Sequence, residues 1–134
     1  MKILLIPPNE VSSIWNDVAP IIDKALRGEE ELIASDFLEP IKIADAFLWI
    51  IVDEIEIESA VITAFIEYPR KKSCSIEAWA TKSGYKFDEV YPLIEEIKTF
   101  ARINGCDFME AKVRKGLAKK LKWNDKHSSV TLTL

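Results

Sequence analysis

The chain has 134 residues, of which 49% are hydrophobic and 30% are charged, and its formal net charge is −4. This length and balance fit one globular domain with its own core, and they exclude a disordered or fibrous chain. The longest apolar run, residues 46–52, is too short to cross a membrane, and the N-terminal apolar patch is too short for a signal peptide. We therefore expect a cytoplasmic protein.

The first part of the chain is predicted to contain one strand and two helices. Residues 2–6 are predicted to form a short buried strand that stops before two prolines. Apolar side chains recur at three- and four-residue steps over residues 11–26, which predicts a helix that Pro20 should kink or restart. Ser35 is the predicted N-cap of a second, shorter helix over residues 36–46.

Three strands are predicted next, over residues 47–53, 57–68 and 73–81, and the simplest arrangement is an antiparallel meander. The third strand alternates in polarity. Its apolar residues, predicted to share one face, are Cys74, Ile76, Ala78 and Ala80. The residues predicted to share the other face are Ser75, Glu77, Trp79 and Thr81.

A long helix is predicted from Phe87 to Ala101, with Asp88 as its N-cap and Asn104–Gly105 as its stop. Pro92 is tolerable there because it falls close to the first turn. The remaining predicted elements are a strand over residues 106–113, a short helix over residues 114–121 and a strand over residues 128–134.

The predicted order of elements is β-α-α-β-β-β-α-β-α-β. It indicates a single domain of the α/β (α+β) class spanning residues 1–134, with helices on both faces of a mixed, mostly antiparallel sheet. The strand–helix–strand piece over residues 73–113 should form a right-handed parallel crossover. Cys74 and Cys106 fall in predicted buried positions without the spacing of a metal or redox motif, so we expect buried thiols rather than a disulfide.

The segment around the end of the long helix carries a resemblance to a known family. It reads A-R-x-x-G-C and then E-x-x-x-R-x-G, at Ala101, Arg102, Gly105, Cys106, Glu110, Arg114 and Gly116. This pattern resembles small GNAT-like proteins of tailed bacteriophages. The element order of nearly the whole chain is similar to that of the GNAT superfamily of acetyl-CoA-dependent N-acetyltransferases. If the chain is phage-encoded, its location would be the host cytoplasm or the virion.

In that family the loop before the central helix has a Q/R-x-x-G-x-G/A pattern, and its backbone N–H groups and the helix N-terminus hold the cofactor pyrophosphate. The resemblance therefore implies acetyl-CoA as cofactor. It places the cofactor-binding residues in the corresponding loop, at Lys82, Ser83, Gly84, Tyr85 and Lys86. Gly84 would allow close approach of the backbone, but a bulky residue replaces the second small one, so the motif is degenerate.

GNAT enzymes often use a carboxylate on a central strand as the base that deprotonates the amine. Glu77 and Glu67 are the two candidates for this catalytic role, provided that burial adjusts their proton affinity. A Tyr on the helix after the next strand often serves as the acid in the family. Residues 112–123 contain no Tyr, Ser or Cys.

Charge is distributed unevenly along the chain. Residues 1–68 carry 14 acidic and 4 basic side chains, and residues 69–134 carry 8 acidic and 14 basic ones. Such asymmetry can direct an acyl-CoA or another anionic ligand, a protein partner or a second copy of the chain toward the basic half. The basic run over residues 112–122 lacks interleaved aromatic side chains, which argues against a nucleic-acid partner. The composition gives no indication of a metal site.

Three functions remain open from the sequence. The chain can be an acetyl-CoA-dependent N-acyltransferase with a degenerate cofactor loop. It can instead be a non-catalytic GNAT-like phage protein that forms part of a particle or contacts the host. The third alternative is a protein that binds acyl-CoA or another anion without turnover. Fold resemblance alone does not decide between an enzyme and a non-enzyme.

Overall fold

A seven-stranded sheet forms the centre of the molecule, with strand order β1-β2-β3-β4-β5-β7-β6. The computed structural model of the chain describes residues 1–26, 32–82, 87–111, 123–126 and 129–134. The strands are Lys2–Leu5 (β1), Phe47–Asp53 (β2), Glu56–Glu67 (β3), Lys72–Thr81 (β4), Phe108–Ala111 (β5), Asn124–Lys126 (β6) and Ser129–Thr133 (β7). Only the β4–β5 pair is parallel among these pairs, which confirms the predicted mixed, mostly antiparallel sheet.

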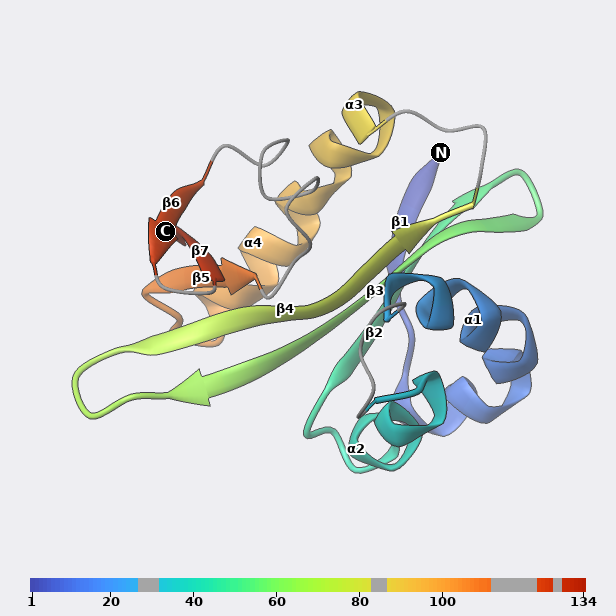
Figure 1. The fold of residues 1–134 in the computed structure, drawn as a ribbon, viewed down its shortest axis with the longest axis horizontal. Coiled ribbons are helices and arrows are strands. Elements are labelled where there is room, and N and C mark those ends of the chain that lie inside the picture. Colours follow the sequence, from blue (N-terminus) through green and yellow to red (C-terminus); the bar gives the residue numbers. More distant parts are fainter. Residues whose placement is uncertain (27–31, 83–86, 112–122, 127–128) are drawn as a thin grey trace.

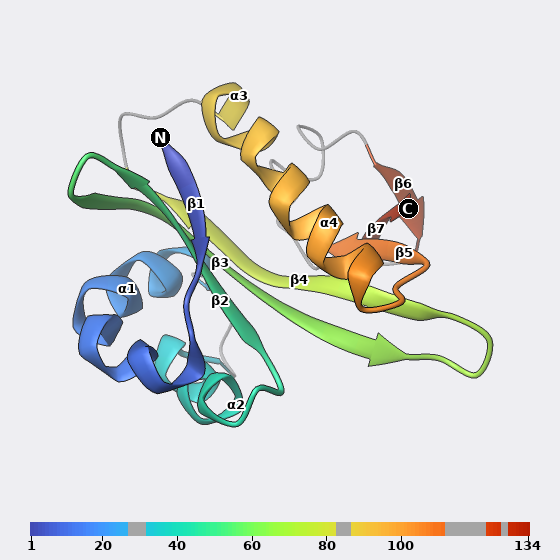
Figure 2. The same ribbon diagram turned by 180° about the vertical axis from the view of Figure 1, so that it is seen from behind.

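Helical segments cover both faces of this sheet (Figures 1 and 2). One face carries α1 and α2, and the other carries α3 and α4. The helices are Val11–Ala25 (α1), Leu38–Lys42 (α2), Phe87–Val90 (α3) and Glu95–Ile103 (α4), and the 3-10 turns are Pro8–Glu10 (η1), Ala34–Phe37 (η2) and Tyr91–Ile94 (η3). No helix of the described residues is long and apolar enough to cross a membrane.

Two helical predictions need correction. Of the kink or restart predicted at Pro20, the restart is wrong: α1 runs through Pro20 as one element, because the residues on both sides bury an apolar stripe against the sheet. The second helix begins earlier than predicted, as the 3-10 turn η2, and Ser35 is not its cap. The N-cap residue is Ile33, and the Asp36 carboxylate, three residues later, accepts a hydrogen bond from the Ile33 N–H at 2.9 Å.

The predicted long helix after β4 is divided into three segments. α3 is followed by η3, with Pro92 in the first turn of that 3-10 segment, and then by α4. Pro92 has no N–H to continue the α-helical ladder, and its ring clashes with the carbonyl four residues earlier. A turn of 3-10 helix at this point avoids the clash and lets the chain resume as α4.

The end of α4 agrees with the predicted Asn104–Gly105 stop. Gly105 has a φ of +79°, in the left-handed region that glycine adopts without strain. The Gly105 N–H donates to the Arg102 carbonyl at 3.0 Å, and the Cys106 N–H donates to the Ala101 carbonyl at 2.9 Å. These bonds satisfy the last helical carbonyls and direct the chain back along the sheet into β5.

Each face of the sheet has its own hydrophobic core. The core on the α1 side contains the following buried residues, among others: Val18, Ile22, Leu48, Ile62 and Ala78. The core on the α4 side contains Val61, Ile76, Ile97, Met109 and both cysteines, among others. Trp15 belongs to the α1-side core, whereas Trp49 and Trp123 belong to the α4-side core and Trp79 packs against it. The predicted burial of Cys74 and Cys106 is confirmed, and both are free thiols.

A β-bulge at Glu77 changes the predicted facing of β4. Ile62 of β3 pairs with Ala78 and Thr63 pairs with Ile76, so Glu77 is the extra residue on the β4 side of the bulge. The extra residue reverses the face of the sheet toward which the following side chains of β4 point. Cys74 and Ile76 therefore belong to the α4-side core, whereas Ala78 and Ala80 belong to the α1-side core. The prediction that these four side chains share one face was wrong.

The C-terminal part of the chain contains one strand that was not predicted. β6 is a three-residue strand that pairs with β7 and forms one edge of the sheet. β7 pairs on its other side with β5 and matches the predicted final strand. The helix predicted over residues 114–121, and most of the basic run, lie outside the described residues.

Candidate active site

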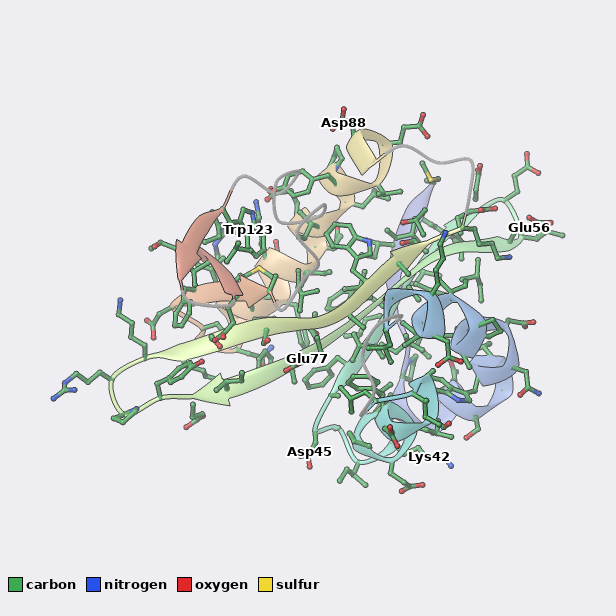
Figure 3. All side chains as sticks on the ribbon, viewed as in Figure 1. Lys42, Asp45, Glu56, Glu77, Asp88 and Trp123 are labelled. Atoms are coloured by element: carbon green, nitrogen blue, oxygen red, sulfur yellow. The ribbon has the colours of Figure 1, made fainter. Side chains whose placement is uncertain are left out.

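The described register of the parallel β4–β5 pair reaches the residue before the bulge. This register runs from Ser73 opposite Phe108 to Ile76 opposite Ala111. Glu77 is the next residue of β4, and its side chain is partly buried. It lies near the middle of the long β4 strand (Figure 3). One predicted catalytic carboxylate therefore stands where the regular ladder is interrupted.

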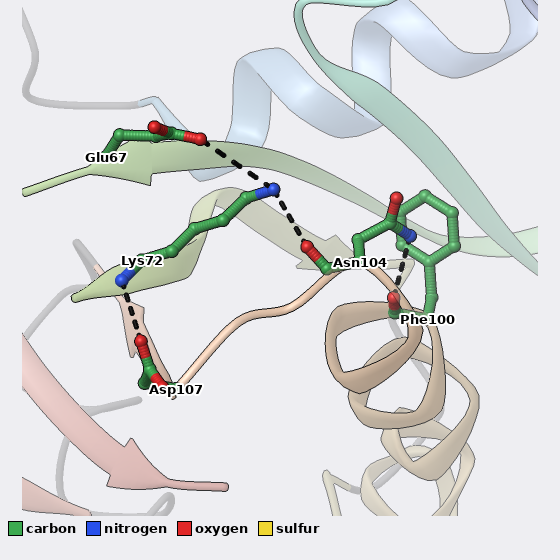
Figure 4. A network of polar contacts seen from close by, with 5 residues as sticks. All are labelled: Glu67, Lys72, Phe100, Asn104 and Asp107. Atoms are coloured by element: carbon green, nitrogen blue, oxygen red, sulfur yellow. Dashed lines mark hydrogen bonds and ion pairs between the residues drawn. The ribbon is translucent and has the colours of Figure 1, made fainter.

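Glu67, the other predicted catalytic carboxylate, has a different environment. It is the last residue of β3, its side chain is 79% exposed, and its carboxylate lies 3.9 Å from the Lys72 ammonium. Lys72 also donates to the Asn104 carbonyl at 2.8 Å, and its backbone N–H donates to the Asp107 carboxylate at 3.0 Å (Figure 4). This network joins the β3–β4 hairpin to the connection between α4 and β5.

The predicted cofactor loop connects β4 to α3. Lys82, its first residue, is exposed, and its backbone N–H donates to the Glu58 carbonyl at 2.8 Å. That N–H is therefore already used within the protein, whereas the Lys82 ammonium lies on the surface. Ser83, Gly84, Tyr85 and Lys86 lie outside the described residues.

A group of four polar residues was not predicted as a site. It consists of Tyr68, Ser73, Ser75 and Glu110, and we call it the Glu110 cluster. One carboxylate oxygen of Glu110, Oε2, accepts a hydrogen bond from the Tyr68 hydroxyl at 2.8 Å and another from the Ser73 hydroxyl at 2.5 Å. Ser73 and Ser75 are completely buried and Glu110 is 6% exposed. Ser75 lies directly opposite Glu110 in the β4–β5 register, so both side chains leave the sheet on the same face.

Electrostatics link this cluster to the bulge. The hydrogen bond to Glu110 raises the pKa of the Tyr68 hydroxyl, and burial and the charges of Glu110 and Glu77 raise it further. Tyr68 therefore stays protonated and acts as a donor toward Glu110. Glu77 of β4 and Glu110 of β5 thus both contribute to the raised pKa of Tyr68.

Sequence reasoning had a partial signal for the cluster. Glu110 is one of the residues that carry the family resemblance, and Ser73 and Ser75 are small polar residues on either side of Cys74. The hydrogen bonds join residues 37 and 42 positions apart, so no local spacing indicates them. Among the described residues no group of three His, Cys, Asp or Glu side chains could hold a metal ion.

No protein-family model matches the chain, and no curated protein matches its sequence. Solved structures do match it. A predicted acetyltransferase from Clostridium acetobutylicum, solved with acetyl-CoA, has a TM-score of 0.71 and 15% identity and covers 93% of this chain and 90% of its own. A GNAT family acetyltransferase from Brucella melitensis, in complex with acetyl-CoA, has a TM-score of 0.68 and 10% identity, with 98% and 86% coverage.

A third match is an aminoglycoside acetyltransferase from an uncultured soil metagenomic sample, solved with sisomicin. Its TM-score is 0.71 at 12% identity, and it covers 93% of this chain and 89% of its own. At such identities the likeness establishes the fold. The chain therefore has the GNAT acetyltransferase fold over nearly its whole length.

Proposed function

We propose that the protein is a GNAT-type acyltransferase that moves an acetyl group from acetyl-CoA to an amine. The observation that carries the proposal is the bulge at Glu77, which directly follows the described register of the parallel β4–β5 pair. The fold supports it, because two structural neighbours were solved with acetyl-CoA. When bound, acetyl-CoA would supply the acetyl group as a thioester with a good leaving group.

The chain's own residues would divide the work between binding and proton transfer. Lys82 and the residues that follow it, through Lys86, would hold the cofactor's phosphates with ammonium and backbone N–H groups. Glu77 would accept one proton from the acceptor ammonium, directly or through water, and so leave a neutral amine that can form the amide bond. The thioester C–S bond would break in exchange, and CoA would leave as its thiol with the second proton of the amine. We favour Glu77 over Glu67, because Glu67 is exposed and lies against the Lys72 ammonium.

A thermal-shift titration with acetyl-CoA tests the cofactor. A ligand present at about 100 times its Kd should stabilise the folded state by roughly 2.7 kcal/mol. Gly84→Glu should abolish the shift, because it adds bulk and negative charge to the proposed phosphate loop. Asn9→Glu adds the same charge to an exposed residue beyond the far end of β1 and should leave the shift unchanged. No shift of the wild type at millimolar acetyl-CoA would contradict the proposal.

The base is tested by acetyl transfer to a panel of amines. Glu77→Gln should lower kcat by about 100-fold or more while the acetyl-CoA thermal shift is retained. Glu56→Gln, at an exposed residue of the β2–β3 hairpin, is the matched control and should change neither quantity. If Glu67→Gln lowers kcat and Glu77→Gln does not, the base has been assigned to the wrong carboxylate.

The second candidate is a non-catalytic GNAT-like protein, either a phage particle component or a host-interaction protein. Two observations favour it: the Lys82 N–H is already engaged by the Glu58 carbonyl, and residues 112–123 lack the acid that the family commonly uses. This function predicts no acetyl-CoA shift and co-purification of the protein with particles or with a host protein. Acetyl-CoA binding together with absence from particles would contradict it.

A further inference from the structure

The Glu110 cluster contains a carboxylate that no described cation neutralises. Glu110 is 6% exposed, and its recorded partners are the hydroxyls of Tyr68 and Ser73. The ion pairs among the described residues involve Glu39, Glu67 and Glu95 instead. A carboxylate removed from water is costly unless it is paired or fully hydrogen-bonded. Its two hydroxyl donors meet only part of that requirement.

Two polar atoms of the cluster have hydrogen-bonding capacity that the described residues do not use. Both recorded bonds to Glu110 end on Oε2, so Oε1 accepts none from the described residues. The Ser75 hydroxyl oxygen is buried and has no hydrogen-bond partner. An orphaned buried hydroxyl is rare in folded proteins and indicates either a missing partner or a site. Because Ser75 pairs with Glu110 across the β4–β5 ladder, these two acceptors lie on the same face.

The surroundings of these acceptors favour a positive charge. Tyr68, which is 45% exposed, stacks on Phe108 with ring centroids 6.0 Å apart, and Phe108 leaves β5 on the same face as Glu110. Aromatic faces attract cations. Glu77 adds a second negative charge near Tyr68. An aromatic pair and a buried carboxylate are therefore joined through the Tyr68 hydroxyl.

We propose that the Glu110 cluster is the subsite that binds the primary ammonium group of the acyl acceptor, so that the acceptor is a slender alkylamine. An ammonium has three N–H donors. Glu110 Oε1 and the Ser75 oxygen can accept two of them, and the positive charge neutralises the carboxylate. A quaternary ammonium has no donor to offer, and both serines are completely buried, so we expect only a primary ammonium on a slender chain to reach the Ser75 oxygen. This proposal rests on the function proposed above.

Steady-state kinetics with n-butylamine as acceptor test the subsite. Glu110→Gln keeps the shape of the side chain and removes the charge, so the KM for n-butylamine should rise by about tenfold or more. The acetyl-CoA thermal shift should stay unchanged. Ser75→Ala removes one acceptor and should raise the same KM by a smaller factor. An unchanged KM in both variants would overturn the proposal, and so would a fall in kcat without a change in KM.

Direct binding keeps the subsite testable without acyl transfer. In the full-length protein, n-butylammonium at millimolar concentration should shift the backbone amide NMR signals of Ser75 and Glu110. Tetramethylammonium at the same ionic strength should not shift them, and Glu110→Gln should abolish the response. Equal shifts with both cations, or none with n-butylammonium, would overturn the proposal.

The two experiments separate the two proposals. If the wild type gives no acetyl-CoA shift but shows the n-butylammonium response, the acyltransferase proposal fails and the ammonium subsite stands. If acetyl-CoA binds and amines other than primary alkylamines are acetylated with Glu110→Gln unaffected, the subsite proposal alone fails. Glu56→Gln serves again as the matched control, since it removes a carboxylate from an exposed position.

Discussion

Cys74 on β4 and Cys106 before β5 are buried thiols in the α4-side core. Burial raises the pKa of Cys74 to about 12, with a smaller contribution from nearby Cys106. Burial also raises the pKa of Cys106. The thiolate is the reactive form of cysteine, so both residues should be inert toward alkylating reagents in the folded protein near neutral pH.

The shifted pKa of Cys74 predicts a loss of stability at alkaline pH. Its value in the folded state lies above the unfolded value, so its contribution to stability is complete below about pH 9 and is lost as the pH rises toward 12. One such group can lower the free energy of unfolding by up to about 1.4 kcal/mol per pH unit. Cys74→Ala should make urea unfolding less dependent on pH between 9 and 12. An identical pH dependence in the variant would contradict this assignment.

At the residue scale, the sequence predicted which residues are buried better than it predicted their hydrogen-bond partners. The two cysteines follow from the apolar pattern of their segments, which is a local property. The bonds of Glu110 to Tyr68 and Ser73 depend on how β4 and β5 align, and that register is set by the whole sheet. The placement of Glu77 as a bulge likewise required the β3 partner residues.

Two helices end at a residue with a positive φ, but only one of these residues is a glycine. Gly105 after α4 has a φ of +79°, and Ala44 after α2 has a φ of +61°. A side chain with a Cβ in this region costs about 1–2 kcal/mol relative to glycine, part of which glycine loses again through its greater freedom in the unfolded chain.

This contrast predicts opposite effects for two matched substitutions. Gly105→Ala should lower the free energy of unfolding by about 1 kcal/mol, although no atom lies within 4 Å of the added Cβ. Ala44→Gly should raise it by up to about 1 kcal/mol. Urea denaturation of both variants checks the pair. A change of the same sign in both would show that the backbone conformation is not the cause.

At the element scale, the sequence predicted which segments are helices and strands better than how they are interrupted. The alternation of residues 73–81 fits a regular strand as well as a bulged one, so the bulge left no local signal. Pro92 did indicate an irregularity, but the choice of a 3-10 turn depends on the packing of α4 against the sheet. β6 is only three residues long and exists because β7 pairs with it.

In the whole molecule, the sheet separates two hydrophobic cores. The strands contribute side chains to both cores, but no residue belongs to both. Ile62 belongs to the α1-side core, and Ile97 of α4 belongs to the core on the opposite face. Each is almost completely buried. Substitutions on opposite faces have no common side-chain neighbours, so their effects on stability should be independent.

Ile62→Val and Ile97→Val should each lower the free energy of unfolding by about 0.5–1.5 kcal/mol. The double variant should lose the sum of the two single losses within about 0.5 kcal/mol. Chemical denaturation monitored by circular dichroism measures all three values. A larger discrepancy would mean that the sheet transmits a packing change from one face to the other.

The unequal division of tryptophans between the two cores has an optical consequence. Three of the four indoles lie on the α4 side of the sheet, and Trp15 alone reports on the α1 side. The intrinsic fluorescence should therefore change more when α4 separates from the sheet than when α1 does. Trp79, two residues beyond Glu77, donates from its indole N–H to the Ser59 hydroxyl at 3.3 Å. The fluorescence of Trp79 should therefore change when a molecule binds beside the bulge, so binding there can be followed without an added label.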